Sequence, residues 1–312
     1  MWSAILSPDF FSTILRSATP ILFATLAAAI AAKAGICNMA LEGIMLFSAL
    51  FGVIFSSLTH SAWLGLLITM VIGGLIGLIL AFFILNLKTD EILAAIAINL
   101  TATGGTVLLL VAVSGDRGVS SSIRSVSAPS VVIPFIEKIP FIGSVLSGQN
   151  ILTWFSILAV ILLHLFLYKT PLGLAIRAVG ENKNAAESVG IDVTKFKLLA
   201  FTISAALAGV AGVLYAHNLS MLKVSGFDYN MSILILVYVV LGGIGNLRGS
   251  MIAAIILYAL PELLRGFANY RMLIYAIVLI VMMLFNWAPA ARNWRARVME
   301  KIKGTKNKKE AA

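Results

Sequence analysis

Residues 62–86 read AWLGLLITMVIGGLIGLILAFFILN, a run of apolar side chains without a single charged residue. An α-helix needs about 20 such residues to cross the hydrocarbon core of a bilayer. The whole chain has the same character: 60% of its 312 residues are hydrophobic and only 12% are charged. Soluble domains are about half apolar and a quarter charged. The composition therefore excludes an ordinary soluble domain and allows about nine spans.

Apolar runs separated by polar residues predict helical spans along the whole chain. The runs are too long, and alternate too little, for the strands of a membrane β-barrel. We therefore expect an all-α polytopic membrane protein with about nine transmembrane helices, which form one domain over residues 1–288. The predicted spans are 10–32, 37–58, 62–86, 91–113, 151–169, 197–217, 229–245, 250–266 and 270–288.

Lys and Arg concentrate in the segment 169–197 and in the tail 289–312, which carries eight of them against two Glu. Such residues mark the cytoplasmic side of a membrane protein. Four predicted spans separate the two segments, so both can be cytoplasmic, with the Lys88 turn inside and 114–150 and the N-terminus outside. Basic charge confined to one end orients the chain and lets the tail contact anionic lipid; it does not indicate nucleic-acid binding.

Motifs for catalysis or cofactor binding are absent from the sequence. It contains no G-x-x-x-x-G-K-[ST] phosphate loop, no G-x-S-x-G nucleophile elbow and no H-E-x-x-H zinc motif. The three histidines are far apart, and the single cysteine, Cys37, cannot form an internal disulfide. We therefore expect no catalytic residue, no metal site and no cofactor bound by this chain, which disfavours an enzyme.

The first polar interruption is GICNMALEG, residues 35–43, inside the second predicted span. Asn38 and Glu42 are four residues apart, which places them on one helical face. One interpretation is a broken helix whose polar groups line a cavity. The other is a helix start, with Asn38 as the cap and Glu42 near the positive end of the helix dipole. The two interpretations are compatible.

A second break, LGGIGNLRG, occupies residues 241–249 between the seventh and eighth predicted spans. Its glycines favour a turn over close helix packing. Asn99, inside the fourth span, can hydrogen-bond between helices or face a pathway, and the first role is favoured. The residues that we expect along a pathway are Asn38, Glu42, Asn99, Gly243 and Asn246.

The predicted cytoplasmic segment 170–195 contains a short helix signal. Asn182 or Asn184 can cap a helix through residues 185–188, and Gly190 can end it. A short helix with small surface residues can enter a groove on another protein. An ordinary solvated connector has the same spacing, so the pattern alone does not decide between them.

Three stretches resemble, in the same order, the permease subunits of bacterial ABC importers for branched-chain amino acids, ribose-type sugars and nucleosides. They are AKAGICNMALEGIMLFSALFGV (32–53), TPLGLAIRAVGENKNAAESVGI (170–191) and VLGGIGNLRGSMIAAIIL (240–257). The resemblance extends from about residue 17 to 288. It implies a permease in the bacterial inner membrane that pairs with a second permease subunit, either a related chain or a second copy of itself, of which the related chain is favoured. It also implies two ATPase subunits, which bind ATP and magnesium, and an extracytoplasmic substrate-binding protein.

The resemblance also assigns a coupling role to the segment that would contact the ATPase. These residues are Gly180, Glu181, Asn182, Ala185, Ala186, Glu187, Ser188 and Gly190. The first two thirds of the chain are most similar to the nucleoside and simple-sugar branch, whereas residues 260–285 look more like a branched-chain amino acid permease. The expected solute is a nucleoside or simple sugar, with branched-chain amino acids as the alternative. An ion-coupled carrier would need intramembrane carboxylates, of which Glu42 is the candidate.

Overall fold

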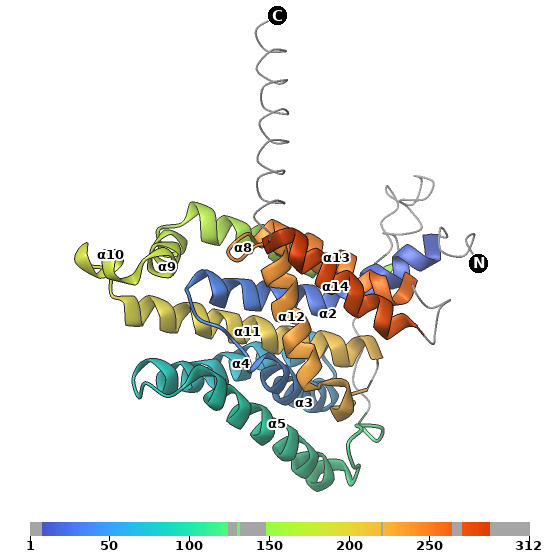
Figure 1. Cartoon of the computed structure of the whole chain (residues 1–312). Helices are drawn as coiled ribbons and strands as arrows, with labels where there is room; N and C mark the ends of the chain where they lie inside the picture. The colour runs from blue at the N-terminus through green and yellow to red at the C-terminus, as the bar shows by residue number, and fades with distance from the viewer. Residues whose placement is uncertain (1–7, 124–129, 132–147, 220, 264–269, 288–312) are drawn as a thin grey trace, which may run out of the picture. The chain divides into compact units, whose positions relative to one another are not determined.

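The computed structural model describes residues 8–123, 130–131, 148–219, 221–263 and 270–287, and nearly all of its ordered elements are helices (Figure 1). A two-stranded antiparallel pair, β1 with β2, is the exception. The elements are α2 (Pro8–Lys33), α3 (Leu41–Thr59), α4 (Ala62–Leu85), α5 (Glu91–Ser114), β1 (Ser130–Val131), β2 (Gln149–Asn150), α8 (Ile151–Lys169), α9 (Pro171–Glu181), α10 (Lys183–Ser188), α11 (Val193–Leu219), η1 (Val224–Gly226), α12 (Tyr229–Gly242), α13 (Leu247–Leu263) and α14 (Arg271–Trp287).

Each predicted apolar run contains one of these helices, which confirms a helical membrane protein. Among the described residues, six helices are long and apolar enough to cross a bilayer by themselves. A seventh candidate is α8 joined to α9, with a bend of 73° between them. Helices α13 and α14 are 17 residues each and are shorter than a full span usually is. The expected count of nine is therefore not confirmed.

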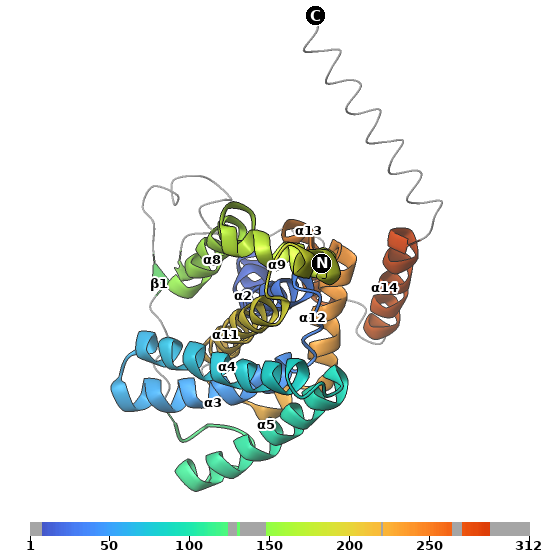
Figure 2. The same cartoon turned by 90° about the vertical axis from the view of Figure 1, so that its left-hand side faces the viewer.

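Helix α11 forms the centre of the bundle and packs against α2, α3 and α4. Figures 1 and 2 both place it between α2 and α4. Two glycines allow this close approach: a Cβ at Gly209 would overlap the carbonyl oxygen of Thr69, and one at Gly212 would overlap that of Met45. Backbone therefore meets backbone where α11 crosses its neighbours, and these contacts fix the packing of the core.

The outward side of the bundle is apolar. Large hydrophobic side chains of α4, such as Leu67, Val71 and Leu75, are about half exposed or more. A continuous apolar surface of this kind would be a liability in water but suits contact with lipid or with another membrane subunit. The arrangement agrees with the apolar run from which the span was predicted.

The chain divides into two compact units, residues 1–259 and 260–312. The described part of the second unit consists of the end of α13 and all of α14. Along α14, exposed apolar side chains recur at helical spacing at Leu273, Ile277, Ile280 and Leu284. This unit therefore presents an apolar helix face of its own.

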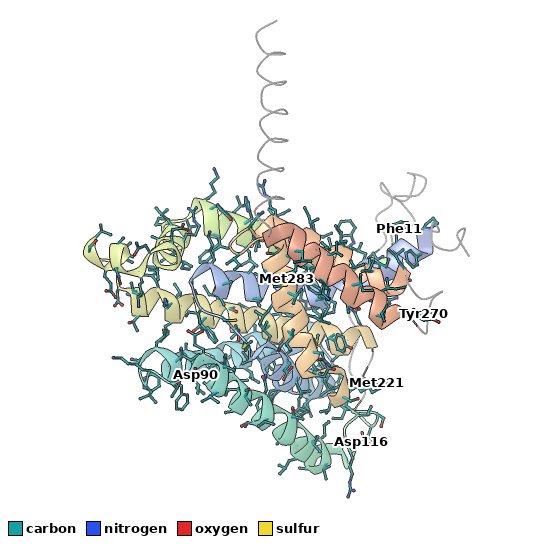
Figure 3. The ribbon with its side chains drawn as sticks, in the orientation of Figure 1. Phe11, Asp90, Asp116, Met221, Tyr270 and Met283 are labelled. Atoms are coloured by element: carbon teal, nitrogen blue, oxygen red, sulfur yellow. The ribbon has the colours of Figure 1, made fainter. Side chains whose placement is uncertain are left out.

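Helix connections that were predicted to be cytoplasmic meet at one end of the first unit, which we call the α10 end. There Cys37 N donates to Glu91 Oε2 at 3.3 Å, and Tyr168 Oη donates to the Gly245 carbonyl at 3.1 Å. Figure 3 shows the two ends of α5 far apart, with Asp90 toward the α10 end and Asp116 at the opposite end. The tail 289–312 lies outside the described residues.

The opposite end is held together by contacts between segments that were predicted to be extracytoplasmic. Ser120 N donates to the Leu222 carbonyl at 2.9 Å. Gln149 Nε2 donates to Ser12 Oγ at 2.8 Å, which ties β2 to the first turns of α2. Most of residues 114–150 beyond these contacts lies outside the described part of the chain.

Candidate functional site in the middle of the bundle

The chain is non-helical between α2 and α3, where the sequence predicted a break. We call residues 34–40 the α2–α3 linker. Gly35 adopts a positive φ of 72°, which favours glycine, and turns the chain out of α2. The linker then enters the bundle and α3 begins at Leu41, with Glu42 in its first turn as the helix-start interpretation predicted. Asn38 is not the cap residue, because Ala40 occupies that position.

Buried polar side chains surround the start of α3. Asn38 Nδ2 donates to Ser204 Oγ of α11 at 3.2 Å, and Glu42 N donates to Ser232 Oγ of α12 at 3.0 Å. Asn38, Glu42 and Asn99 are 1%, 8% and 6% exposed. These five residues, Asn38, Glu42, Asn99, Ser204 and Ser232, are the polar cluster. It joins four helices around one helix start.

Asn99 holds the start of α3 against α5. Its Oδ1 accepts from Gly43 N at 3.1 Å, and its Nδ2 donates to the Met39 carbonyl at 3.1 Å. A Cβ at Gly43 would approach Asn99 Oδ1 to 2.5 Å, so only glycine leaves room for this contact. Asn99 therefore acts as the interhelical hydrogen-bonding group that the sequence favoured.

The polar cluster lies about half-way through the bundle. A helix rises about 1.5 Å per residue, so Asn99 is about 12 Å from the start of α5, Ser204 about 16 Å from the start of α11 and Ser232 about 15 Å from the end of α12. All three helix ends lie at the α10 end. Three independent helices thus place the cluster at the same distance from the α10 end, about half the thickness of a bilayer core of about 30 Å.

Glu42 is incompletely paired in this cluster. Ser232 Oγ accepts from the Glu42 backbone N–H at 3.0 Å, whereas the carboxylate oxygen Oε2 is buried and has no hydrogen-bond partner among the described residues. A buried carboxylate oxygen without a donor is costly in a low-dielectric environment. Such a group in a membrane protein is a candidate functional site, because a hydrogen-bond donor from a ligand would relieve the cost.

The other two expected pathway residues lie elsewhere. Gly243, with a φ of 94°, ends α12, and Asn246 caps α13 by accepting from Gly249 N at 3.2 Å. Both belong to the α12–α13 turn at the α10 end. A Cβ at Gly242 would overlap the backbone of Ser250, so the glycines also allow close packing of α12 against α13. The preferred turn interpretation is correct, and the packing alternative applies as well.

The coupling segment forms two helices rather than one. Helix α9 follows the bend after α8, and Thr170 caps it by accepting from Gly173 N at 3.1 Å. The sequence did not predict α9. Asn182 caps α10 by accepting from Ala185 N at 3.1 Å, as predicted. Gly190, with a φ of 82°, follows the end of α10 as a left-handed stop.

The residues expected to couple to an ATPase separate into an outer and an inner set. Glu181, Asn182, Ala185, Glu187, Ser188 and Gly190 are exposed. Ala186 instead points inward and packs with Val179 of α9 and Val193 of α11 in a small hydrophobic cluster. This cluster fixes α10 on the ends of its two neighbouring helices.

Gly180 connects α9 to the α2–α3 linker. If Gly35 carried a Cβ, the nearest atom to it would be the Gly180 Cα, at 3.5 Å. A Cβ on Gly180 would in turn overlap the Lys33 carbonyl oxygen. The coupling segment therefore rests directly on the backbone that leads into Asn38 and Glu42. This contact could not be predicted from the sequence, because the two glycines are far apart in the chain.

Several residues of the site were not predicted. Ser204 and Ser232 are small polar residues in apolar helices and carry no local signal. Asp228, which caps α12 by accepting from Met231 N at 3.1 Å, could have been found, because an acidic residue directly before an apolar run is a helix-start signal.

Comparison with known proteins identifies the family of this arrangement. Residues 10–285 match the family described as branched-chain amino acid transport system / permease component. The chain belongs to this family. The resemblance noted in the sequence is thereby confirmed. No solved structure matches the chain.

Relatives within this permease family carry names that cover three kinds of solute. A putative glucose ABC transporter permease protein of Haloferax volcanii is 31% identical over 216 residues, 68% of this chain and 64% of the relative. A nucleoside ABC transporter permease protein of Lactococcus lactis is 32% identical over 218 residues, 67% of each chain. A high-affinity branched-chain amino acid permease protein of Salmonella typhimurium is 36% identical over 170 residues, 53% of this chain and 40% of the relative. The match thus spans about two thirds of the length of the sugar and nucleoside relatives.

Proposed function

We propose that this chain is the membrane-spanning subunit of an ATP-driven importer and forms the translocation path for a nucleoside or simple sugar. The family and the names of the sugar and nucleoside relatives support this function. ATP and magnesium bind to a separate ATPase subunit. An extracytoplasmic binding protein delivers the solute, and a second permease, a related chain, completes the path.

The α9–α10 pair carries the proposal, because it is built as a docking element. Helix α10 is capped at both ends, anchored from inside by Ala186, and exposed on its outer residues. Val189, directly after it, is 74% exposed, so an apolar side chain faces outward beside the small residues. A rigid, exposed helix with small and apolar side chains suits a groove on an ATPase subunit.

Movement of α10 would reach the middle of the membrane through backbone contacts. Gly180 rests on the α2–α3 linker, and this linker ends at the polar cluster. The start of α3 is thus mechanically tied to the docking element, which suits a path whose access alternates with the state of the ATPase. Asn38, Glu42 and Asn99 form the middle of the path, and Gly243 and Asn246 contribute at its α10-end mouth.

The assembly in the membrane follows from the same proposal. The α10 end and the tail 289–312 face the cytoplasm of a bacterial cell, and the basic tail contacts anionic lipid of the inner membrane. Helices α13 and α14 are the remaining two of about nine proposed spans. Solute arrives at the opposite end, where the segments around Ser120 and Leu222 meet.

A charge introduced on the outer face of α10 tests the function. Ala185→Glu changes an exposed residue and should abolish co-purification of the ATPase and ATP-driven nucleoside uptake in proteoliposomes, with normal membrane insertion. Thr89→Glu, at an exposed position of the α4–α5 turn, is the matched control and should leave both unchanged. Full uptake by Ala185→Glu would show that α10 is not the docking element.

Branched-chain amino acids are the second candidate solute. The description of the family and the 36% identity to the Salmonella typhimurium protein favour them. Uptake of labelled leucine in the same proteoliposomes, with the binding protein encoded beside the permease, separates the two candidates. Transport of leucine instead of a nucleoside or sugar would change the solute and leave the proposed coupling intact.

A further inference from the structure

A second carboxylate lies inside a candidate span, near Glu42. Asp228 is exposed in the isolated chain and belongs to the apolar segment Val224–Gly242. Its Oδ1 caps α12, and its Oδ2 accepts from Asn230 Nδ2 at 3.2 Å. A carboxylate at membrane depth is too costly to face lipid, so such groups line water-filled space or a subunit interface that contains it. Asp228 therefore places a charged group at the start of α12, within the candidate span.

The geometry places Asp228 and Glu42 on the same site. Asp228 is the residue directly before α12 and caps its first turn, and Ser232 is the fourth residue of this helix. Ser232 Oγ accepts from Glu42 N at 3.0 Å, and the Asp228 carboxylate lies within electrostatic range of Glu42. The buried Glu42 Oε2 has no hydrogen-bond partner among the described residues. Two carboxylates thus face one region from α3 and α12.

Hydrogen-bond donors at this site are already occupied by the protein. The Gly43 N–H at the start of α3 is bonded to Asn99, and the Met231 N–H at the start of α12 is bonded to Asp228 itself. The candidate spans Leu41–Thr59 and Val224–Gly242 contain no Lys or Arg. The site therefore offers carboxylate acceptors, and these two spans supply no Lys or Arg side chain to pair with a solute carboxylate or phosphate.

An aromatic pair stands beside the carboxylates. The rings of Tyr215 on α11 and Phe227 pack edge to face with centroids 5.0 Å apart. Tyr215 also lies within electrostatic range of Asp228. Aromatic faces next to a few fixed polar groups are the usual construction of a site for a small ring-shaped ligand.

We propose that Asp228 and Glu42 form a solute-binding site in the path that accepts hydrogen bonds from the hydroxyl groups of an uncharged ring solute and disfavours anionic solutes. This inference rests on the proposed import function and adds to it the two side chains that would hold the hydroxyl groups of the solute. Asp228 and Glu42 each accept from a hydroxyl, and the Tyr215–Phe227 pair contacts the ring.

The test compares a solute that has both ribose ring hydroxyls with one that lacks them. ATP-driven uptake is measured in proteoliposomes that contain the permease pair, its ATPase and its binding protein, with labelled uridine and with dideoxyuridine, which lacks both ribose ring hydroxyls. The variant is Asp228→Asn, which keeps the helix cap because Asn caps as well as Asp. Asp90→Asn is the matched control, since Asp90 caps α5 in the same way outside the site.

Asp228→Asn should lower the maximal uptake rate of uridine by about tenfold, because a hydrogen bond to a charged acceptor is stronger than one to a neutral acceptor. Dideoxyuridine uptake should fall less than twofold, so the preference for uridine shrinks. The binding protein is the same throughout and cancels from this comparison. Equal losses for both solutes, or a loss in Asp90→Asn as large as in Asp228→Asn, would overturn the inference. Absence of uptake of any nucleoside or sugar by the wild type would instead overturn the import function itself.

Discussion

Removal of the Asn99 side chain tests whether the polar cluster holds α3 in place. Asn99→Ala deletes two interhelical hydrogen bonds, to Gly43 N and the Met39 carbonyl, each 3.1 Å long. Side-chain hydrogen bonds between membrane helices contribute about 0.6 kcal/mol on average and about 1.7 at most. Two average hydrogen bonds would contribute about 1 kcal/mol to the free energy of unfolding, and two strong ones about 3 kcal/mol.

The larger value is expected here. Gly43 N lies in the first turn of α3, where no intrahelical acceptor exists, and Met39 lies in the non-helical linker. Both backbone groups are therefore left unpaired in the mutant, and an unpaired buried group costs about 1–3 kcal/mol. We expect Asn99→Ala to lower the free energy of unfolding by about 2–3 kcal/mol.

The measurement is reversible unfolding in mixed detergent micelles with increasing dodecyl sulfate, followed by circular dichroism. Asn99→Leu fills the volume without the hydrogen bonds and should lose a similar amount, which separates lost bonds from a cavity. Thr101→Ala is the control: Thr101 is exposed, and its hydroxyl bonds only to its own helix, at the Ala97 carbonyl. Losses below about 0.5 kcal/mol in both Asn99 variants, the size usual for surface changes, would refute the reasoning.

Three other changes probe the α10 end. Gly180→Ala places a Cβ on the Lys33 carbonyl at the end of α2 and should cost about 1–3 kcal/mol, measured by the same unfolding assay. Gly104→Ala is the control, because the Cβ position of Gly104 is open. Gly190→Ala forces alanine into a left-handed conformation and should cost about 1–2 kcal/mol, by the same measurement. Cys37 is exposed, yet neighbouring atoms partly desolvate the thiol, and this desolvation and then the Glu91 carboxylate raise its pKa. Glu91→Gln removes the negative charge near the thiol and should therefore lower the pKa of Cys37. Because maleimide reacts with the thiolate, the pH profile of Cys37 labelling should shift to lower pH. An unchanged profile would contradict this.

The sequence was informative where the signal was local. Asn182 and Gly190 predicted the cap and the end of α10, because each acts within one helical turn. Helix α9 was missed, since Pro171 reads as the end of a span although it is also favourable in the first turn of a new helix. The contact between Asn38 and Ser204 was not readable, because 166 residues separate them and neither position carries a pairing signal.

The single cysteine of the chain gives the protein a built-in reporter. Cys37 is the only cysteine in the sequence and lies in the α2–α3 linker, between the proposed docking element and the proposed path. One spin label per subunit can be attached without removing other thiols. In an assembly of two identical copies, dipolar spectroscopy would return one intersubunit distance. If the partner chain lacks cysteine, no intersubunit distance is measured. The same sample would therefore report whether two copies of this chain pair, and how the distance between their linkers changes when ATP binds.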